Sequence, residues 1–117
     1  DELRSDIGIS CCEKIKEAGY YPMIYASENW FRRSLEVESL QEYDFWAPQY
    51  LEENDFLYDF TMWQYTDQGS IPGVVGDVDL DISMVDYASF VPQMREAYLT
   101  GVEYGAKPKD ELTITTE

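Results

Sequence analysis

Histidine is absent from this sequence of 117 residues, and cationic side chains are few. Without histidine, a Ser-His-Asp triad and a His-ligated metal site are both excluded, and we expect neither a metal nor a cofactor. Only 8 Lys and Arg residues stand against 24 Asp and Glu, which gives a formal net charge of −16 at pH 7. Such a surface repels phosphate groups and anionic lipid heads, so neither nucleic acid nor a membrane is expected as a partner.

Cysteine is also scarce, and long apolar runs are missing. Cys11 and Cys12 are adjacent, a placement that does not suit ordinary disulfide geometry, so we predict two small buried residues on a helix. No apolar run approaches the roughly 20 residues that span a bilayer. The chain opens on "DELRSD" without a signal peptide. This abrupt start suggests a fragment.

Apolar and aromatic residues, by contrast, are plentiful. Apolar residues make up 44% of the chain, enough for a core, and the length suits one domain or part of one. Ten Tyr, five Phe and three Trp accompany the many acids. Aromatic faces beside acids fit a neutral polyol such as a sugar, although an aromatic core is the simpler interpretation.

Hydrophobic periodicity predicts an alternation of helices and strands. In the first helix, Ile7, Cys11 and Ile15 form one apolar stripe, with Cys12 and Ala18 beside them, which we expect to face the core. In the second, Trp30, Leu35 and Leu40 are the candidate core residues. The predicted helices are 5–18, 29–41 and 86–98, and the predicted strands are 21–27, 44–50, 60–66 and 77–83.

The order of these elements predicts the fold class. Helix and strand alternate at first, which favours parallel βα units and an α/β fold. An irregular (β/α) barrel, or a piece of one, is the natural interpretation, because about four strands cannot close a barrel of the usual eight. The polar, Thr-rich stretch 105–117 resembles a linker.

Three acids alternate in "DVDLD": Asp77, Asp79 and Asp81. An EF-hand loop that begins at Asp77 would need Gly and Glu at its sixth and twelfth positions, but Ile82 and Ala88 stand there. A solvated edge remains possible. If the strand is parallel and covered on both faces, a lone buried carboxylate costs several kcal/mol, and at least one acid lines a polar cavity.

Three further side chains are candidates for the same cavity. Gln64 lies between Trp63 and Tyr65, and its amide could bind a sugar hydroxyl or hold a neighbouring Asp in place. Trp46 and Tyr25 lie near predicted strand ends and are either core residues or platforms for a ligand.

The segments "AGYYPMIYASENWF", "YDFWAPQY" and "MWQYTDQGSIPGVVGDVDLD" occur in this order. Together they resemble the second half of glycoside hydrolase family 25, the secreted bacterial and phage muramidases or lysozymes. The similarity runs from about residue 5 to about residue 90. The WQYT–G–PG–G–VDLD pattern is the specific part, whereas the helix at 5–18 is not.

The resemblance implies an irregular TIM-like (β/α) barrel that cleaves the β-1,4 bond between N-acetylmuramic acid and N-acetylglucosamine in peptidoglycan. Catalytic carboxylates of this family gather at the C-terminal ends of the strands. The VDL aspartate matches Asp79, which would be catalytic. Tyr25, Trp46 and Gln64 match positions in or near the sugar groove. Residues 1–100 would be the C-terminal half of the barrel and 101–117 a tail.

One departure from the family pattern limits this interpretation. The family's Asp-x-Glu strand, which carries the general acid/base, has no counterpart in this sequence. The resemblance implies a secreted, cell-wall-acting parent enzyme, which we expect to be a monomer. Because glycoside hydrolysis needs two carboxyl groups, we expect the isolated chain to be inactive. The alternatives are a glycan-binding or degenerate barrel module that does not cleave, and a different α/β hydrolytic barrel.

Overall fold

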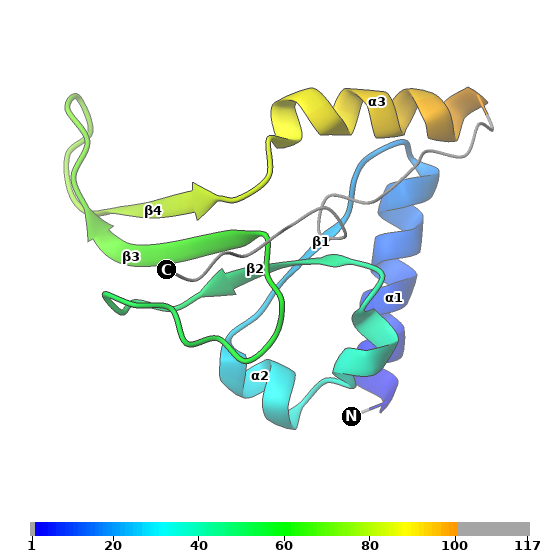
Figure 1. The fold of residues 1–117 in the computed structure, drawn as a ribbon, viewed down its shortest axis with the longest axis horizontal. Helices are drawn as coiled ribbons and strands as arrows, with labels where there is room; N and C mark the ends of the chain where they lie inside the picture. Colours follow the sequence, from blue (N-terminus) through cyan, green and yellow to red (C-terminus); the bar gives the residue numbers. More distant parts are fainter. Residues whose placement is uncertain (1, 101–117) are drawn as a thin grey trace.

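The computed structural model describes residues 2–100 of the chain and gives one sheet with helices beside it (Figure 1). This mixed architecture confirms the predicted α/β class. The elements in chain order are α1 (Glu2–Glu17), β1 (Met23–Tyr25), α2 (Glu28–Arg33), the 3-10 helix η1 (Val37–Leu40), β2 (Asp44–Pro48), β3 (Met62–Gly69), β4 (Val78–Ser83) and α3 (Tyr87–Thr100).

The four strands form a single sheet in the order β1-β2-β3-β4. The pairs β1–β2 and β2–β3 are parallel, as βα units require, whereas β4 runs antiparallel to β3. The condition of a parallel strand covered on both faces, under which one of the three acids would line a polar cavity, is therefore not met by β4. The connection from β3 to β4, residues 70–77, is too short for a parallel crossover, which needs about a dozen residues or more.

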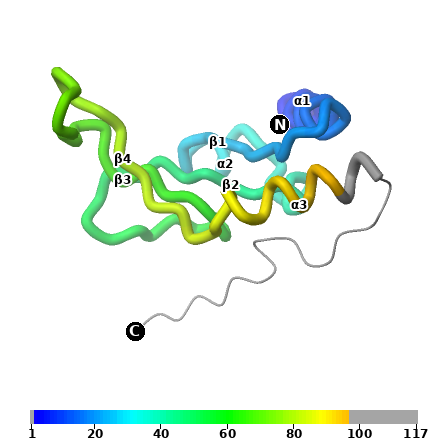
Figure 2. The backbone as a smooth tube through the Cα atoms, turned by 90° about the horizontal axis from the view of Figure 1, so that it is seen from above, coloured from blue at the N-terminus to red at the C-terminus, as the bar shows by residue number. Residues whose placement is uncertain are grey.

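That connection forms a hairpin tip that projects away from the helices in both views (Figures 1 and 2). Its turn is closed by a hydrogen bond from the Val74 N–H to the Ile71 carbonyl, 3.1 Å. Pro72 and Gly73 occupy the two central positions, and Gly73 has a φ of +90°. Proline followed by a glycine with positive φ is the signature of a type II turn, which fixes the start of β4 relative to β3.

The hydrophobic core lies on one face of the sheet, under α1, α2 and η1. Phe45 and Ala47 of β2 are fully buried, and Phe45 packs against Phe31 of α2 with ring centroids 4.6 Å apart. The other buried core residues are Cys12, Leu40, Tyr43 and Phe56. Because side chains alternate along a strand, residues 44, 46 and 48 of β2 face the opposite side.

Helix α1 is turned differently from the prediction. Ile7, Cys11 and Ile15 are exposed, whereas Ser5 and Cys12 are buried. Small side chains line the inner face, and Ser5 Oγ accepts a hydrogen bond of 2.7 Å from the backbone N–H of Glu36. This buried bond satisfies the N–H just before η1. The face with Ser5, Ile9 and Cys12 therefore lies against the rest of the molecule, and of the predicted stripe only Cys12 is buried.

The predicted helix 29–41 is two shorter elements. Ser27 caps α2 by accepting from the Trp30 N–H, the helix ends at Ser34, and η1 follows. Leu40, at the end of η1, is completely buried, whereas Trp30 in α2 is 49% exposed. The Arg4 guanidinium lies 5.5 Å from the Trp30 ring. Of the three expected core residues, Trp30 is therefore on the surface and Leu35 is half-buried.

The remaining boundaries agree more closely. Pro48 ends β2, because a proline cannot donate the next ladder bond. The four-stranded α/β sheet is consistent with part of a TIM-like barrel. None of the described helices has the length and apolar character needed to cross a bilayer. The predicted tail at 101–117 lies outside the described residues.

Candidate functional site

The strand register brings the predicted site residues together on the face opposite the core. Tyr25, the last residue of β1, is paired with Trp46 of β2. Gln64 of β3 is paired with Pro48 on one side and with Asp81 on the other. Residues paired across neighbouring strands point to the same face. Four strands therefore contribute to one polar and aromatic surface, which lies near the carboxyl ends of β1 and β2 and extends over β3 and β4.

Gln64 is the centre of this surface and is only 4% exposed. Its Oε1 accepts hydrogen bonds from the hydroxyls of Tyr25, 2.8 Å, and Tyr50, 2.7 Å. Its Nε2 donates to Oδ2 of Asp79 over 3.4 Å. The amide thus joins β1, the segment after β2 and β4 at one point, and Asp79 lies beside it as an exposed carboxylate.

Trp46 contacts a different acid. Its indole Nε1 donates to Oδ1 of Asp81 over 2.7 Å, and its ring meets that of Tyr25 edge-on, with centroids 5.0 Å apart. Asp79 and Asp81 therefore share the face with Gln64 and Trp46, as their alternation predicts. Asp77 precedes β4 and is exposed, so the three acids are not equivalent.

Tyr50 is a member of the site that the sequence analysis missed. It follows β2 by two residues, and its hydroxyl reaches Gln64. Desolvation, together with the neighbouring Tyr25 and the charges of Asp67 and Asp79, raises the pKa of Tyr50. The phenol therefore stays protonated and remains a donor to Gln64 in neutral solution. Its position at the end of the predicted strand 44–50 was the one available signal.

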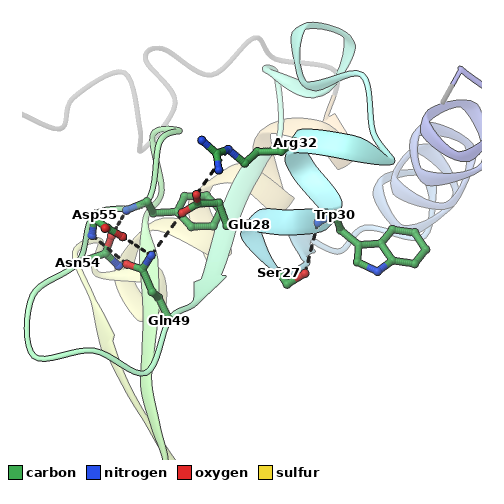
Figure 3. A network of polar contacts seen from close by, with 8 residues as sticks. Ser27, Glu28, Trp30, Arg32, Gln49, Asn54 and Asp55 are labelled. Carbon is green, nitrogen blue, oxygen red and sulfur yellow. Dashed lines mark hydrogen bonds and ion pairs between the residues drawn. The ribbon is translucent and has the colours of Figure 1, made fainter.

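The side chain of Gln49 fastens the loop that carries Tyr50 to α2 (Figure 3), and the backbone of Gln49 fastens it to β3. Gln49 Nε2 donates to Asp55 Oδ1, 2.5 Å, and to Glu28 Oε2, 3.3 Å, while its Oε1 accepts from the Asp55 N–H, 2.8 Å. Its backbone N–H donates to the Gln64 carbonyl over 3.0 Å, and its carbonyl accepts from Trp63 Nε1 over 2.7 Å. We call Gln49, Glu28 and Asp55 the loop clamp.

A second polar cluster lies at the opposite end of β2 and was not anticipated. Asp44 is fully buried, and its Oδ2 accepts from the hydroxyls of Tyr21 and Tyr87, each at 2.8 Å. Tyr87 also shares a hydrogen bond with Thr61. These contacts tie the start of α3 to the sheet, so this cluster holds the fold together and does not belong to the site around Gln64.

The groups that this site offers to a ligand are carboxylates and aromatic rings. Asp79 is exposed and accepts from Gln64, whose amide oxygen binds Tyr25, and the ring of Tyr25 packs against that of Trp46. Apolar ring faces next to hydrogen-bonding groups are suited to carbohydrate rings. Within residues 2–100, no group of three or more His, Cys, Asp or Glu side chains is placed to hold a metal ion.

Comparisons with known proteins bear on the family and the fold of the chain. The model of glycosyl hydrolases family 25 matches residues 8–74, which is more than half of the chain; the matched range includes Tyr25, Trp46 and Gln64 and ends before Asp79. A search of the curated proteins gave no match.

Among solved structures, the chain resembles that of the CTP1L endolysin, whose description states that its activity is regulated by a secondary translation product. The TM-score is 0.51 at 19% sequence identity, over 61% of this chain. The matched part is 27% of the endolysin chain, so the likeness concerns the fold of a portion of that protein.

Proposed function

Because this chain belongs to the glycosyl hydrolases of family 25, we propose that it forms part of a muramidase. The enzyme hydrolyses the β-1,4 bond between N-acetylmuramic acid and N-acetylglucosamine in peptidoglycan. In this proposal Asp79 is a catalytic carboxylate, and Tyr25, Trp46 and Gln64 line the sugar groove. The enzyme acts outside the cell, on the wall, as a monomer.

The observation that carries the proposal is the position of Asp79. Its neighbours Val78 and Leu80 pair with Gly69 and Thr66, so Asp79 lies along the second half of β3. It is beside Gln64 and on the face that carries Tyr25 and Trp46. In the nearby Asp81, by contrast, Oδ1 accepts a hydrogen bond from the Trp46 indole. No described hydrogen bond occupies Oδ1 of Asp79, so this oxygen can meet a substrate amide or the positive charge that develops on the sugar ring.

The proposal also requires a second carboxyl group. Glycoside hydrolysis needs a proton donor on one side of the bond and a carboxylate on the other. The sequence contains no Asp-x-Glu, the family's acid/base pattern. We propose that this donor is supplied by another part of the barrel, and that Asp79, close to it, raises its pKa and helps to keep it protonated.

A cell-wall turbidity assay on the intact protein that carries this chain tests the proposal. Asp79→Asn is expected to lower kcat by about 100-fold or more, because a transition-state charge loses its counter-charge, while the protein still folds. The matched control is Asp77→Asn, which removes an exposed charge two residues away and should leave kcat within about twofold. Equal activity of the Asp79→Asn variant and the wild type would overturn the assignment.

The isolated 117-residue chain should not lyse cell walls, because it lacks the proton donor. Robust lysis by this chain alone would contradict that expectation.

The absent Asp-x-Glu favours one alternative, a module that binds wall glycan without cutting it. Under this alternative, the intact protein would sediment with peptidoglycan but release no reducing ends, and Asp79→Asn would leave the bound fraction unchanged.

A further inference from the structure

The hydrogen-bonding capacity of Gln64 is nearly exhausted by protein groups. A side-chain amide oxygen has two acceptor sites, and the amide nitrogen has two donor hydrogens. The hydroxyls of Tyr25 and Tyr50 fill both sites on Oε1, and one hydrogen of Nε2 is directed at Asp79. With 4% of its surface exposed, Gln64 has little left to offer a sugar.

The two tyrosines also decide which way the amide points. A phenol hydroxyl can donate to the amide oxygen, and both phenols lie at distances typical of O–H···O bonds, 2.8 and 2.7 Å. Turning the amide over would place its NH₂ group against two hydroxyls and its oxygen against the Asp79 carboxylate. Two acceptors would then face each other, so the observed orientation is strongly preferred.

Tyr50 is held in place by more than its own bond to Gln64. It follows Gln49, whose side chain is bound by Asp55 and Glu28 (Figure 3). The backbone of Gln49 is bound to the Gln64 carbonyl and to the Trp63 indole. Within α2, Glu28 also forms an ion pair with Arg32, with Nε and Oε1 3.7 Å apart. The loop clamp therefore fixes the start of the loop and, with it, the phenol of Tyr50.

We infer that Gln64 is a positioning residue rather than a sugar ligand: Tyr25 and Tyr50 lock its amide so that the NH₂ group orients the Asp79 carboxylate. Oδ2 of Asp79 is held by this bond and Oδ1 is left for the substrate. Tyr50 thereby acquires a function, and Gln64 acts through Asp79. The inference rests on the proposed function for its effect on catalysis, but the geometry of the amide can be tested separately.

Steady-state kinetics of the intact protein on soluble peptidoglycan fragments provides the first test. Gln64→Met keeps the length of the side chain and a weak acceptor, but removes the donor to Asp79 without adding a second carboxyl group beside it. It should lower kcat by about tenfold or more with little change in KM, as expected when a hydrogen bond to a charged group is lost in the transition state. A rise in KM with an unchanged kcat would mean that Gln64 binds substrate, and would overturn the inference.

The paired variant Tyr25→Phe/Tyr50→Phe tests the lock itself. It should lower kcat by about tenfold in the wild-type background and by less than twofold in the Asp79→Asn background, because residues that act through one another are not additive. Multiplicative losses in the two backgrounds would overturn the inference. Tyr20→Phe is the matched control: it removes a phenol hydroxyl before β1, keeps the ring 5.7 Å from the Arg95 guanidinium, and should leave kcat unchanged.

A measurement without substrate separates this inference from the proposed function. In ¹⁵N NMR spectra of the same protein, the Gln64 side-chain amide should give two resolved signals that exchange slowly with water, and Tyr25→Phe/Tyr50→Phe should abolish this protection. If the wild-type protein fails to cleave peptidoglycan but the protected signals are present, the proposed function fails and the positioning stands. Rapid exchange of the wild-type amide would overturn the positioning.

Discussion

Cys11 and Cys12 are adjacent on one helix but lie in different environments. Cys11 is exposed, whereas Cys12 is 4% exposed and belongs to the core. Burial, with the charges of Cys11, Glu13 and Glu42, raises the pKa of Cys12 to about 11. Since the thiolate is the reactive form, the two thiols should react at very different rates.

Alkylation with iodoacetamide checks this difference. At pH 8 we expect one equivalent to be incorporated at Cys11, identified by peptide mass spectrometry, and at least a tenfold slower reaction at Cys12. Urea should make both thiols react equally, because unfolding exposes Cys12 and returns its pKa to the ordinary range. Equal rates in the folded protein would contradict the burial of Cys12.

The sequence predicted single residues well when a strand fixed their direction. The alternation in "DVDLD" placed Asp79 and Asp81 on one face. Asp79 contacts Gln64 and Asp81 contacts Trp46, both of them predicted residues. The sequence did not predict Tyr50, because a loop has no periodicity that specifies where its side chains point. Whether Gln64 serves the substrate or Asp79 was left open, since that choice depends on atoms from three other segments.

At the scale of elements, two glycines differ in the space that the neighbouring atoms leave for a side chain. Gly69 ends β3 where it passes Leu80 of β4, and a Cβ built there would lie 2.4 Å from the Leu80 Cγ and 3.0 Å from the Val78 carbonyl oxygen. Gly8 lies within α1, where an added Cβ would meet nothing within 4 Å. Position 69 therefore has no room for a side chain, whereas position 8 does.

Substituting alanine at each position should therefore change stability with opposite signs. Gly69→Ala is expected to destabilise by about 1–3 kcal/mol through overpacking against β4. Gly8→Ala should stabilise by about 0.5–1 kcal/mol, because alanine loses less backbone freedom in a helix. Urea denaturation of the intact protein measures both. A neutral Gly69→Ala variant would show that β3 and β4 are not packed as closely as described.

Helices were predicted less accurately than strands, and the reason is visible in α1. Periodicity identified an apolar stripe at Ile7, Cys11 and Ile15, yet the small face with Ser5 and Cys12 is the buried one. An amphipathic pattern states that two faces differ, but the neighbouring elements decide which face is covered. Here the bond between Ser5 and the Glu36 N–H marks the covered face.

At the scale of the whole molecule, the net charge and the unpaired sheet edges have opposite effects on the association of one chain with another. The formal charge of −16 keeps copies of the chain apart. Within the described sheet, β1 and β4 each pair on one side only. Unpaired strand edges attract other strands, so repulsion is what we expect to keep the isolated chain dispersed.

Salt should shift this balance in the 117-residue chain studied alone. Raising NaCl from 0.01 to 0.15 M shortens the Debye length from about 30 to about 8 Å and weakens the repulsion. Light scattering should then report a several-fold higher mass, whereas sucrose at matched osmolality should not. A monomer at both salt concentrations would contradict the importance of the open edges.

The sequence by itself determined the α/β class, the strand positions and the motif that relates the chain to its family, because these depend on local periodicity and on residue order. Only the tertiary structure decided the antiparallel direction of β4, the inner face of α1 and the orientation of the Gln64 amide. Each of these depends on groups distant in sequence: a hairpin too short to cross over, a backbone N–H beside η1, and two tyrosine hydroxyls that meet at one oxygen.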